Sequence, residues 1–179
     1  MRKFFVSIAL LFGLLIAIPQ ASMAQTAEQA AAGRTALLAE LEALGVSEAD
    51  AEPEDLADAA AAAMAANPAL AAAIVQAAVA SQPASAPIIV GAIVASPVKP
   101  ASISAGSVAA AASVVAPEQS AQIVVAAATS SGESIESIVT EVAAATGQDE
   151  AALAAAAESA STDDNPGGES GGDDEGTPS

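Results

Sequence analysis

The chain has 179 residues, of which 53 are alanine, and it carries 22 Asp or Glu against four Lys or Arg, for a net charge of −18. It has no Cys, His, Trp or Tyr. This composition excludes disulfides, thiolate or imidazole metal sites, and every mechanism that needs a His or Cys. Because no catalytic constellation remains, we predict no catalytic, cofactor-binding or metal-binding residues and expect a protein that is not an enzyme.

The first 24 residues have the layout of a secretory signal peptide. Arg2 and Lys3 precede an apolar run over residues 4–18, and the small residues of Ser22-Met23-Ala24 fit a cleavage site. The run of about 15 residues is shorter than the roughly 20 that a membrane-spanning helix needs. We therefore predict cleavage of residues 1–24, with Gln25 first, and a periplasmic or extracellular location.

The charge of the mature chain limits its partners. Cleavage keeps all 22 carboxylates and only two cations, Arg34 and Lys99, so the net charge becomes −20. Nucleic acid binding needs clustered Lys or Arg and stacking side chains, and anionic lipid surfaces repel an acidic chain. We expect no nucleic acid partner and no stable membrane span after cleavage, but a protein partner or self-association.

Residues 25–66 predict a pair of helices. Leu37, Leu38, Leu41 and Leu44 recur at helical spacing, and Gly45 fits a helix stop. Two starts are open for the second helix, which runs to about residue 66 in either case. One is the capping-box pattern of residues 47–50, Ser-Glu-Ala-Asp, and the other places Pro53 at the first helical position.

Residues 67–160 contain an imperfect repeat. Pro68, Pro83, Pro117 and Gly132 are each followed, six and seven residues later, by an Ile-Val pair. The pairs are Ile74-Val75, Ile89-Val90, Ile123-Val124 and Ile138-Val139. Pro suits the first turn of a helix, and Ala has the highest helix propensity. Each unit therefore predicts a helix of about 11 to 14 residues, with the Ile-Val pairs forming the core between neighbouring helices.

Two further capping signals belong to this region. Asn67 is expected to cap the first unit, and residues 146–149, Thr-Gly-Gln-Asp, are expected to open a last helix that ends near residue 160. The fold class predicted from these patterns is all-α. Ala-rich short antiparallel helices form a hairpin repeat or a small bundle, followed by a disordered acidic C-terminal tail.

The tail covers residues 161–179 and has no apolar side chain larger than Pro. It cannot bury enough surface to offset its ordering entropy, so we predict disorder. Its carboxylates do not match an EF-hand loop, and we expect at most weak association with divalent cations.

Two short motifs resemble parts of known functional sites, but both resemblances are weak. Ser96 and Lys99 have the S-x-x-K spacing of Ser–Lys acyl enzymes, but the accompanying elements are missing and Pro97 interrupts the helical turn. Thr129 and Thr140 lie 11 residues apart, a spacing that resembles some Ala-rich helical ice-binding proteins, but the pairing occurs once.

An exported structural or interaction protein is therefore the function that the sequence favours. The alternative is a subunit of a secreted fibre or biofilm matrix. Residues 87–95, PIIVGAIVA, are β-branched and uncharged, and windows of that kind assemble into cross-β structure when they are exposed.

Overall fold

The computed structural model describes residues 26–163, so the predicted signal peptide and most of the acidic tail lie outside the described residues. Over residues 26–163 the chain forms eight α-helices and no strand, which confirms the predicted all-α class. The helices are α1 (Ala27–Leu44), α2 (Pro53–Ala66), α3 (Ala71–Ser81), α4 (Ala86–Ala95), α5 (Ala105–Val115), α6 (Ser120–Ser131), α7 (Ile135–Thr146) and α8 (Glu150–Asp163).

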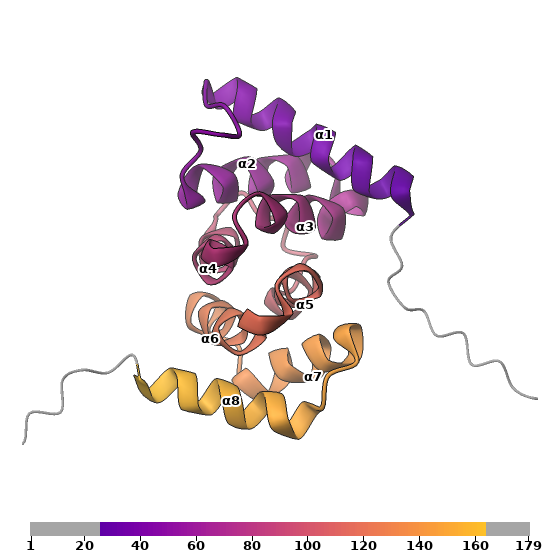
Figure 1. Ribbon diagram of the computed structural model, residues 1–179. Coiled ribbons are helices and arrows are strands. Elements are labelled where there is room, and N and C mark those ends of the chain that lie inside the picture. Colours follow the sequence, from indigo (N-terminus) through magenta and orange to yellow (C-terminus); the bar gives the residue numbers. More distant parts are fainter. Residues whose placement is uncertain (1–25, 164–179) are drawn as a thin grey trace, which may run out of the picture.

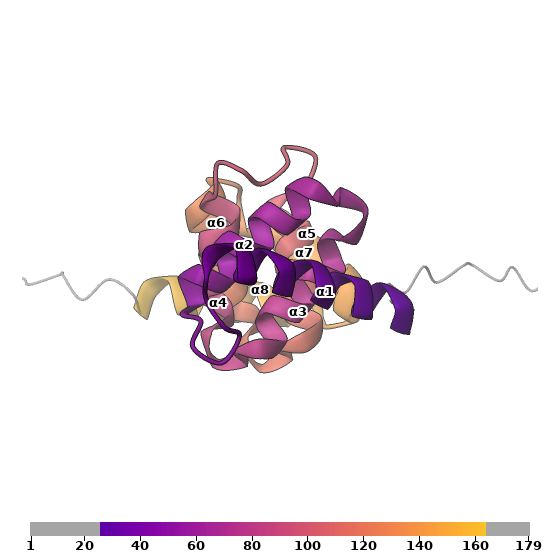
Figure 2. The ribbon, with the colours of Figure 1, turned by 90° about the horizontal axis from the view of Figure 1, so that it is seen from above.

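The helices are piled so that each one packs on the helix two positions further along the chain. Thus α1 packs on α3, α2 on α4, and so on to α6 on α8. Figure 1 shows α1 at one end of the pile and α7 and α8 at the other, and Figure 2 looks down on the pile from the α1 end. The chain turns by 112° between α3 and α4, so this pair is closer to a right angle than to an antiparallel hairpin.

The Ile-Val pairs form the core, as predicted. All eight of their side chains are at most 1% exposed. In α5, where the repeat loses its register, Val108 is buried in the same way. Leu37, Leu41, Leu56 and Met64 extend this core through α1 and α2.

The three prolines of the repeat act alike. Pro68, Pro83 and Pro117 each begin a 3₁₀ turn, named η1 (Pro68–Leu70), η2 (Pro83–Ser85) and η3 (Pro117–Gln119), which leads into α3, α4 and α6. A proline disfavours the helical conformation of the residue before it, and those residues have φ of −137°, −141° and −121°. The preceding helix therefore ends where the next one begins, which produces a sharp corner without a long loop.

Gly132 works differently from the prolines that it replaces in the repeat. It adopts a left-handed conformation, with φ of 74°, and closes α6. The next helix then starts after Ser134, whose hydroxyl accepts a hydrogen bond from the Ser137 amide at 3.3 Å. Gly132 is therefore a helix stop rather than a helix start, because only glycine reaches positive φ without strain.

One predicted helix cap, that of Asn67, was wrong, and the structure selects one of the two starts left open for the second helix. Asn67 makes no side-chain capping hydrogen bond, because the corner at Pro68 holds it away from the geometry of a cap. The Ser47 hydroxyl donates to the Asp50 carboxylate at 2.6 Å within a turn, and α2 begins at Pro53, the alternative start.

The last helix also starts later than the Thr-Gly-Gln-Asp pattern suggested. Thr146 is the last residue of α7, and Gly147 closes that helix with φ of 73°. The cap of α8 is Asp149, whose Oδ1 accepts from the Ala152 amide at 2.8 Å. At its other end α8 continues to Asp163, three residues into the segment predicted as tail.

Three glutamines connect the corners of the pile. The side-chain amide of Gln82 donates to the Ala51 carbonyl at 2.6 Å, that of Gln119 to the Pro83 carbonyl at 2.8 Å, and that of Gln148 to the Ser120 hydroxyl at 3.1 Å. Each bond joins the start of one even-numbered helix to the start of the next, from α2 to α8. These bonds set the register of the even-numbered helices.

Candidate functional site

Charge is distributed unevenly along the described chain. Residues 59–117 contain a single charged side chain, that of Lys99. Residues 40–58, at the junction of α1 and α2, contain eight carboxylates. These are Glu40, Glu42, Glu48, Asp50, Glu52, Glu54, Asp55 and Asp58. The α1–α2 junction therefore holds the densest cluster of carboxylates among the described residues, whereas residues 118–163 carry a further eight that are spread over a longer stretch.

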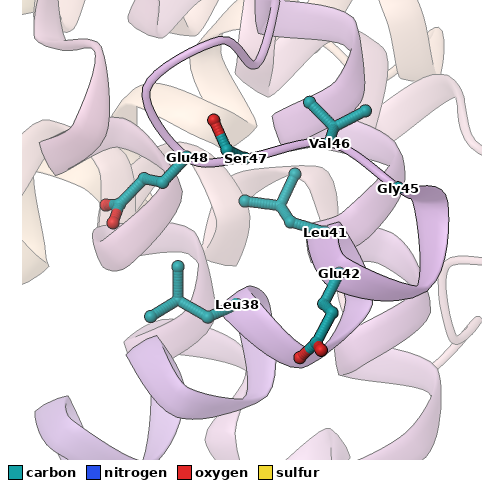
Figure 3. A pocket seen from close by; sticks show the side chains of 7 residues that line it. All are labelled: Leu38, Leu41, Glu42, Gly45, Val46, Ser47 and Glu48. Atoms are coloured by element: carbon teal, nitrogen blue, oxygen red, sulfur yellow. The ribbon is translucent and has the colours of Figure 1, made fainter.

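A surface hollow of about 430 Å³ lies at this junction. Its lining consists of Leu38, Leu41, Glu42, Gly45, Val46, Ser47 and Glu48. Figure 3 shows the two leucines between the carboxylates of Glu42 and Glu48. We call this hollow the junction groove. It combines an apolar floor with an acidic border.

The end of α1 builds the groove. Gly45 adopts a left-handed conformation, with φ of 77°, and reverses the chain. The Val46 amide then donates to the Leu41 carbonyl at 3.0 Å, which is the bond of a Schellman helix end. This motif characteristically brings an apolar residue after the glycine against one in the last turn, so Val46 sits beside Leu41.

Glu48 is held in place by two other elements. Arg34 of α1 contacts both of its carboxylate oxygens, at 3.0 and 3.2 Å, and the Ser81 hydroxyl at the end of α3 donates to it at 2.8 Å. The hydrogen bond from Ser81, followed by those from Arg34, lowers the pKa of the Glu48 carboxyl below its usual value. The border of the groove therefore carries a positioned, ionised carboxylate.

Glu42 supplies the opposite border and is exposed. The single ion pair among residues 26–163 is that of Arg34 with Glu48. The charge of Glu42 is thus balanced by no cation of the described region. The groove has one carboxylate that is anchored and one that is available.

The two short motifs of the sequence do not form sites. Ser96 and Lys99 lie in a turn after α4, where the Lys99 ammonium donates to the Ile103 carbonyl at 2.7 Å. Thr129 lies on α6 and Thr140 on α7, so the two threonines do not share one helix face. The Thr140 hydroxyl instead contacts the Glu150 carboxylate at 2.8 Å.

The described residues contain neither a metal-binding cluster nor a single membrane-spanning helix. Within residues 26–163 no three His, Cys, Asp or Glu side chains are grouped as a metal site would require. The described helices include no single one that is long and apolar enough to cross a membrane. The pair formed by residues 68–81 and 83–95 reaches that length and hydropathy together, but with the 112° bend between its halves.

Comparison with protein families, with curated proteins and with solved structures finds no match for this chain. The groove must therefore be interpreted from its own chemistry. The groove was not predicted from the sequence, although two signals were present. Leu38 adds a leucine beside the buried stripe of Leu37 and Leu41, and the carboxylates of residues 40–58 are unusually dense.

Proposed function

We propose that this is an exported, non-enzymatic protein of Ala-rich helical repeats that binds a protein partner at the acidic α1–α2 junction. The observation that carries the proposal is the junction groove, where Leu38, Leu41 and Val46 are bordered by Glu42 and Glu48. Its volume lies within the range of about 300–1,000 Å³ that is usual for ligand sites.

Export is supported by the signal-peptide layout of residues 1–24. Mass spectrometry of protein recovered outside the cytoplasm tests it, and we expect a chain that begins at Gln25. A chain that retains the apolar run over residues 4–18 would contradict export by cleavage.

Photo-crosslinking tests binding at the groove. A photoreactive amino acid replaces Ala43, an exposed residue beside Glu42, and in a control variant it replaces Ala151, an exposed residue of α8. In the producing cell we expect a discrete protein adduct from position 43 and none from position 151. Equal adducts at both positions, or none at either, would contradict a binding role for this junction.

The fibre-subunit alternative receives less support. Residues 87–95 lie wholly within α4, where Ile89, Val90, Ile93 and Val94 are buried. Assembly through strands would require α4 to leave the core first. Circular dichroism of the mature protein separates the two proposals, since helix minima that persist during incubation favour the binding scaffold. A change to a single strand-type minimum with dye binding would favour the fibre.

A further inference from the structure

The junction groove has a specific chemical asymmetry. Its floor is apolar, with the half-buried residues Leu38 and Val46 in its lining, whereas both borders are carboxylates. An occupant that matched only the floor would bring apolar groups against the exposed carboxylate of Glu42, which no cation of the described region balances. An occupant that matched only the borders would leave the exposed parts of Leu38 and Val46 in water. Complementarity therefore requires apolar and cationic groups in one ligand.

The geometry points to one occupant. We propose that the groove receives a cationic amphipathic segment of a partner protein, with apolar side chains on Leu38 and Val46 and a Lys or Arg beside Glu42. This proposal rests on the protein-binding function proposed above and specifies the chemistry of the partner. Helices that lay an apolar face into a hydrophobic groove are a recurrent mode of peptide recognition.

Charge also decides against two occupants from the same chain. The described residues carry 17 carboxylates and two cations, and one of those cations, Arg34, is engaged by Glu48. A second copy of this chain would therefore bring like charge against like charge. The sequence of residues 164–179 has five carboxylates and no cation, so it is repelled from the groove as well.

A synthetic peptide tests the proposal on the full mature chain, residues 25–179. The probe is a dye-labelled peptide of about 18 residues, with Leu on one helical face and Lys on the flanks, and the control peptide has the same composition in a non-amphipathic order. Binding is measured by fluorescence anisotropy at about 150 mM salt, which screens long-range attraction. We expect the amphipathic peptide to bind at least ten-fold more tightly than the control.

Matched variants locate the binding. Glu42→Gln should weaken binding of the amphipathic peptide about two- to five-fold, whereas Glu136→Gln, an equal loss of charge at an exposed site on α7, should leave it unchanged. Val46→Ala should weaken binding about three- to ten-fold through lost apolar contact, with Val114→Ala on α5 as its exposed control. Circular dichroism of each variant verifies that the fold is intact.

The outcomes separate this inference from the proposed function. Equal binding of both peptides, or equal weakening by Glu42→Gln and Glu136→Gln, would show attraction to net charge alone and would overturn the groove as the site. A partner crosslinked at position 43 together with no peptide binding would retain the protein-binding function and overturn the cationic chemistry of the partner.

Discussion

Large apolar side chains are scarce in this protein, so each buried isoleucine supplies a large share of the hydrophobic stabilisation. The core between α3 and α8 consists mainly of Ala and Val, and fully buried isoleucines occur at positions 74, 89, 93, 123 and 138. Alanine removes little surface from water, which leaves most of the hydrophobic stabilisation to these few residues.

Ile138→Ala tests this dependence. Truncation of a buried isoleucine costs about 2–5 kcal/mol, and we expect the lower part of that range, because the alanine-rich surroundings supply few contacts. The melting temperature should fall by several degrees in a thermal unfolding experiment. Ser137→Ala, at the exposed neighbouring position, is the control and should leave it nearly unchanged. Equal melting of the two variants would contradict the assigned core.

At Ser113, substitution by alanine is expected to raise stability rather than lower it. Its side chain is fully buried in α5, and its hydroxyl has no hydrogen-bond partner among the described residues. A buried, unsatisfied polar group costs about 1–3 kcal/mol, so Ser113→Ala should raise stability, by up to about 1 kcal/mol after the small loss of packing. Chemical denaturation measures the change.

Ser120→Ala is the matched comparison for Ser113→Ala. The Ser120 hydroxyl is also buried, but it donates to the Pro117 carbonyl at 2.9 Å and accepts from Gln148. Its removal should destabilise the protein by about 1 kcal/mol, because it leaves the Gln148 amide without that partner. If Ser120→Ala stabilised the protein and Ser113→Ala destabilised it, the hydrogen bonding assigned to the two hydroxyls would be contradicted.

The lowered pKa of Glu48 predicts that the stability of the fold depends on pH. Its pKa is lowered in the folded state by Ser81 and Arg34, so it contributes stability at pH values above its unfolded pKa of about 4.5, and that stability is lost as the pH falls through the lower folded value. Glu48→Gln should therefore destabilise the protein at neutral pH and have a shrinking effect below about pH 4.5. Melting curves from pH 7 to pH 3 for both proteins measure this, and a constant difference would contradict the assignment.

At the scale of whole helices, packing distance is set by small residues. Gly33 of α1 lies against α3 so closely that a Cβ atom built on it would be 2.5 Å from the Ala73 Cβ and 2.6 Å from the Ala73 carbonyl carbon. The second of these atoms belongs to the backbone, so the contact is relieved only if the helices separate. The α1–α3 pair therefore requires glycine at position 33.

Gly33→Ala should destabilise the protein even though alanine is the better helix former. The propensity gain is about 1 kcal/mol, whereas overpacking between helices typically costs about 1–3 kcal/mol and here involves backbone atoms. Gly91→Ala is the control, since its Cβ would first meet the Ser130 hydroxyl at 3.2 Å. We expect that variant to be neutral or stabilised in thermal unfolding. If both variants gained stability, the requirement for glycine in the close contact between α1 and α3 would be contradicted.

Across the whole molecule, charge opposes folding. The described residues carry 17 carboxylates and two cations, and their single ion pair, Arg34–Glu48, cannot offset the resulting repulsion. Raising the salt concentration from about 10 to 200 mM shortens the screening length from about 30 Å to below 10 Å, so the melting temperature should rise by a few degrees. A melting temperature that falls with salt would show that attractive ion pairs dominate instead.

The sequence by itself determined the local structure of this protein. The helical class, the corners at Pro68, Pro83 and Pro117, and the burial of the Ile-Val pairs all follow from backbone preferences and from a spacing that repeats within a single helix. These signals act over a few residues, where φ, ψ and the positions i+3 and i+4 decide the outcome. The wrong capping assignments arose where a neighbouring residue imposed another conformation, as Pro68 does after Asn67 and Gly147 does after Thr146.

The tertiary structure decided everything that joins one helix to another. The contact of Glu48 with Ser81 spans 33 residues, and the Gln119 bond to Pro83 spans 36. Because alanine covers nearly every helix face, the sequence holds little information on which faces meet or in which register. The junction groove depends on these contacts, since Gly45 reverses the chain locally but the packing of α1 on α3 brings Arg34 and Ser81 to Glu48. Close approach between small side chains thus set the architecture of the site, and local sequence signals do not encode it.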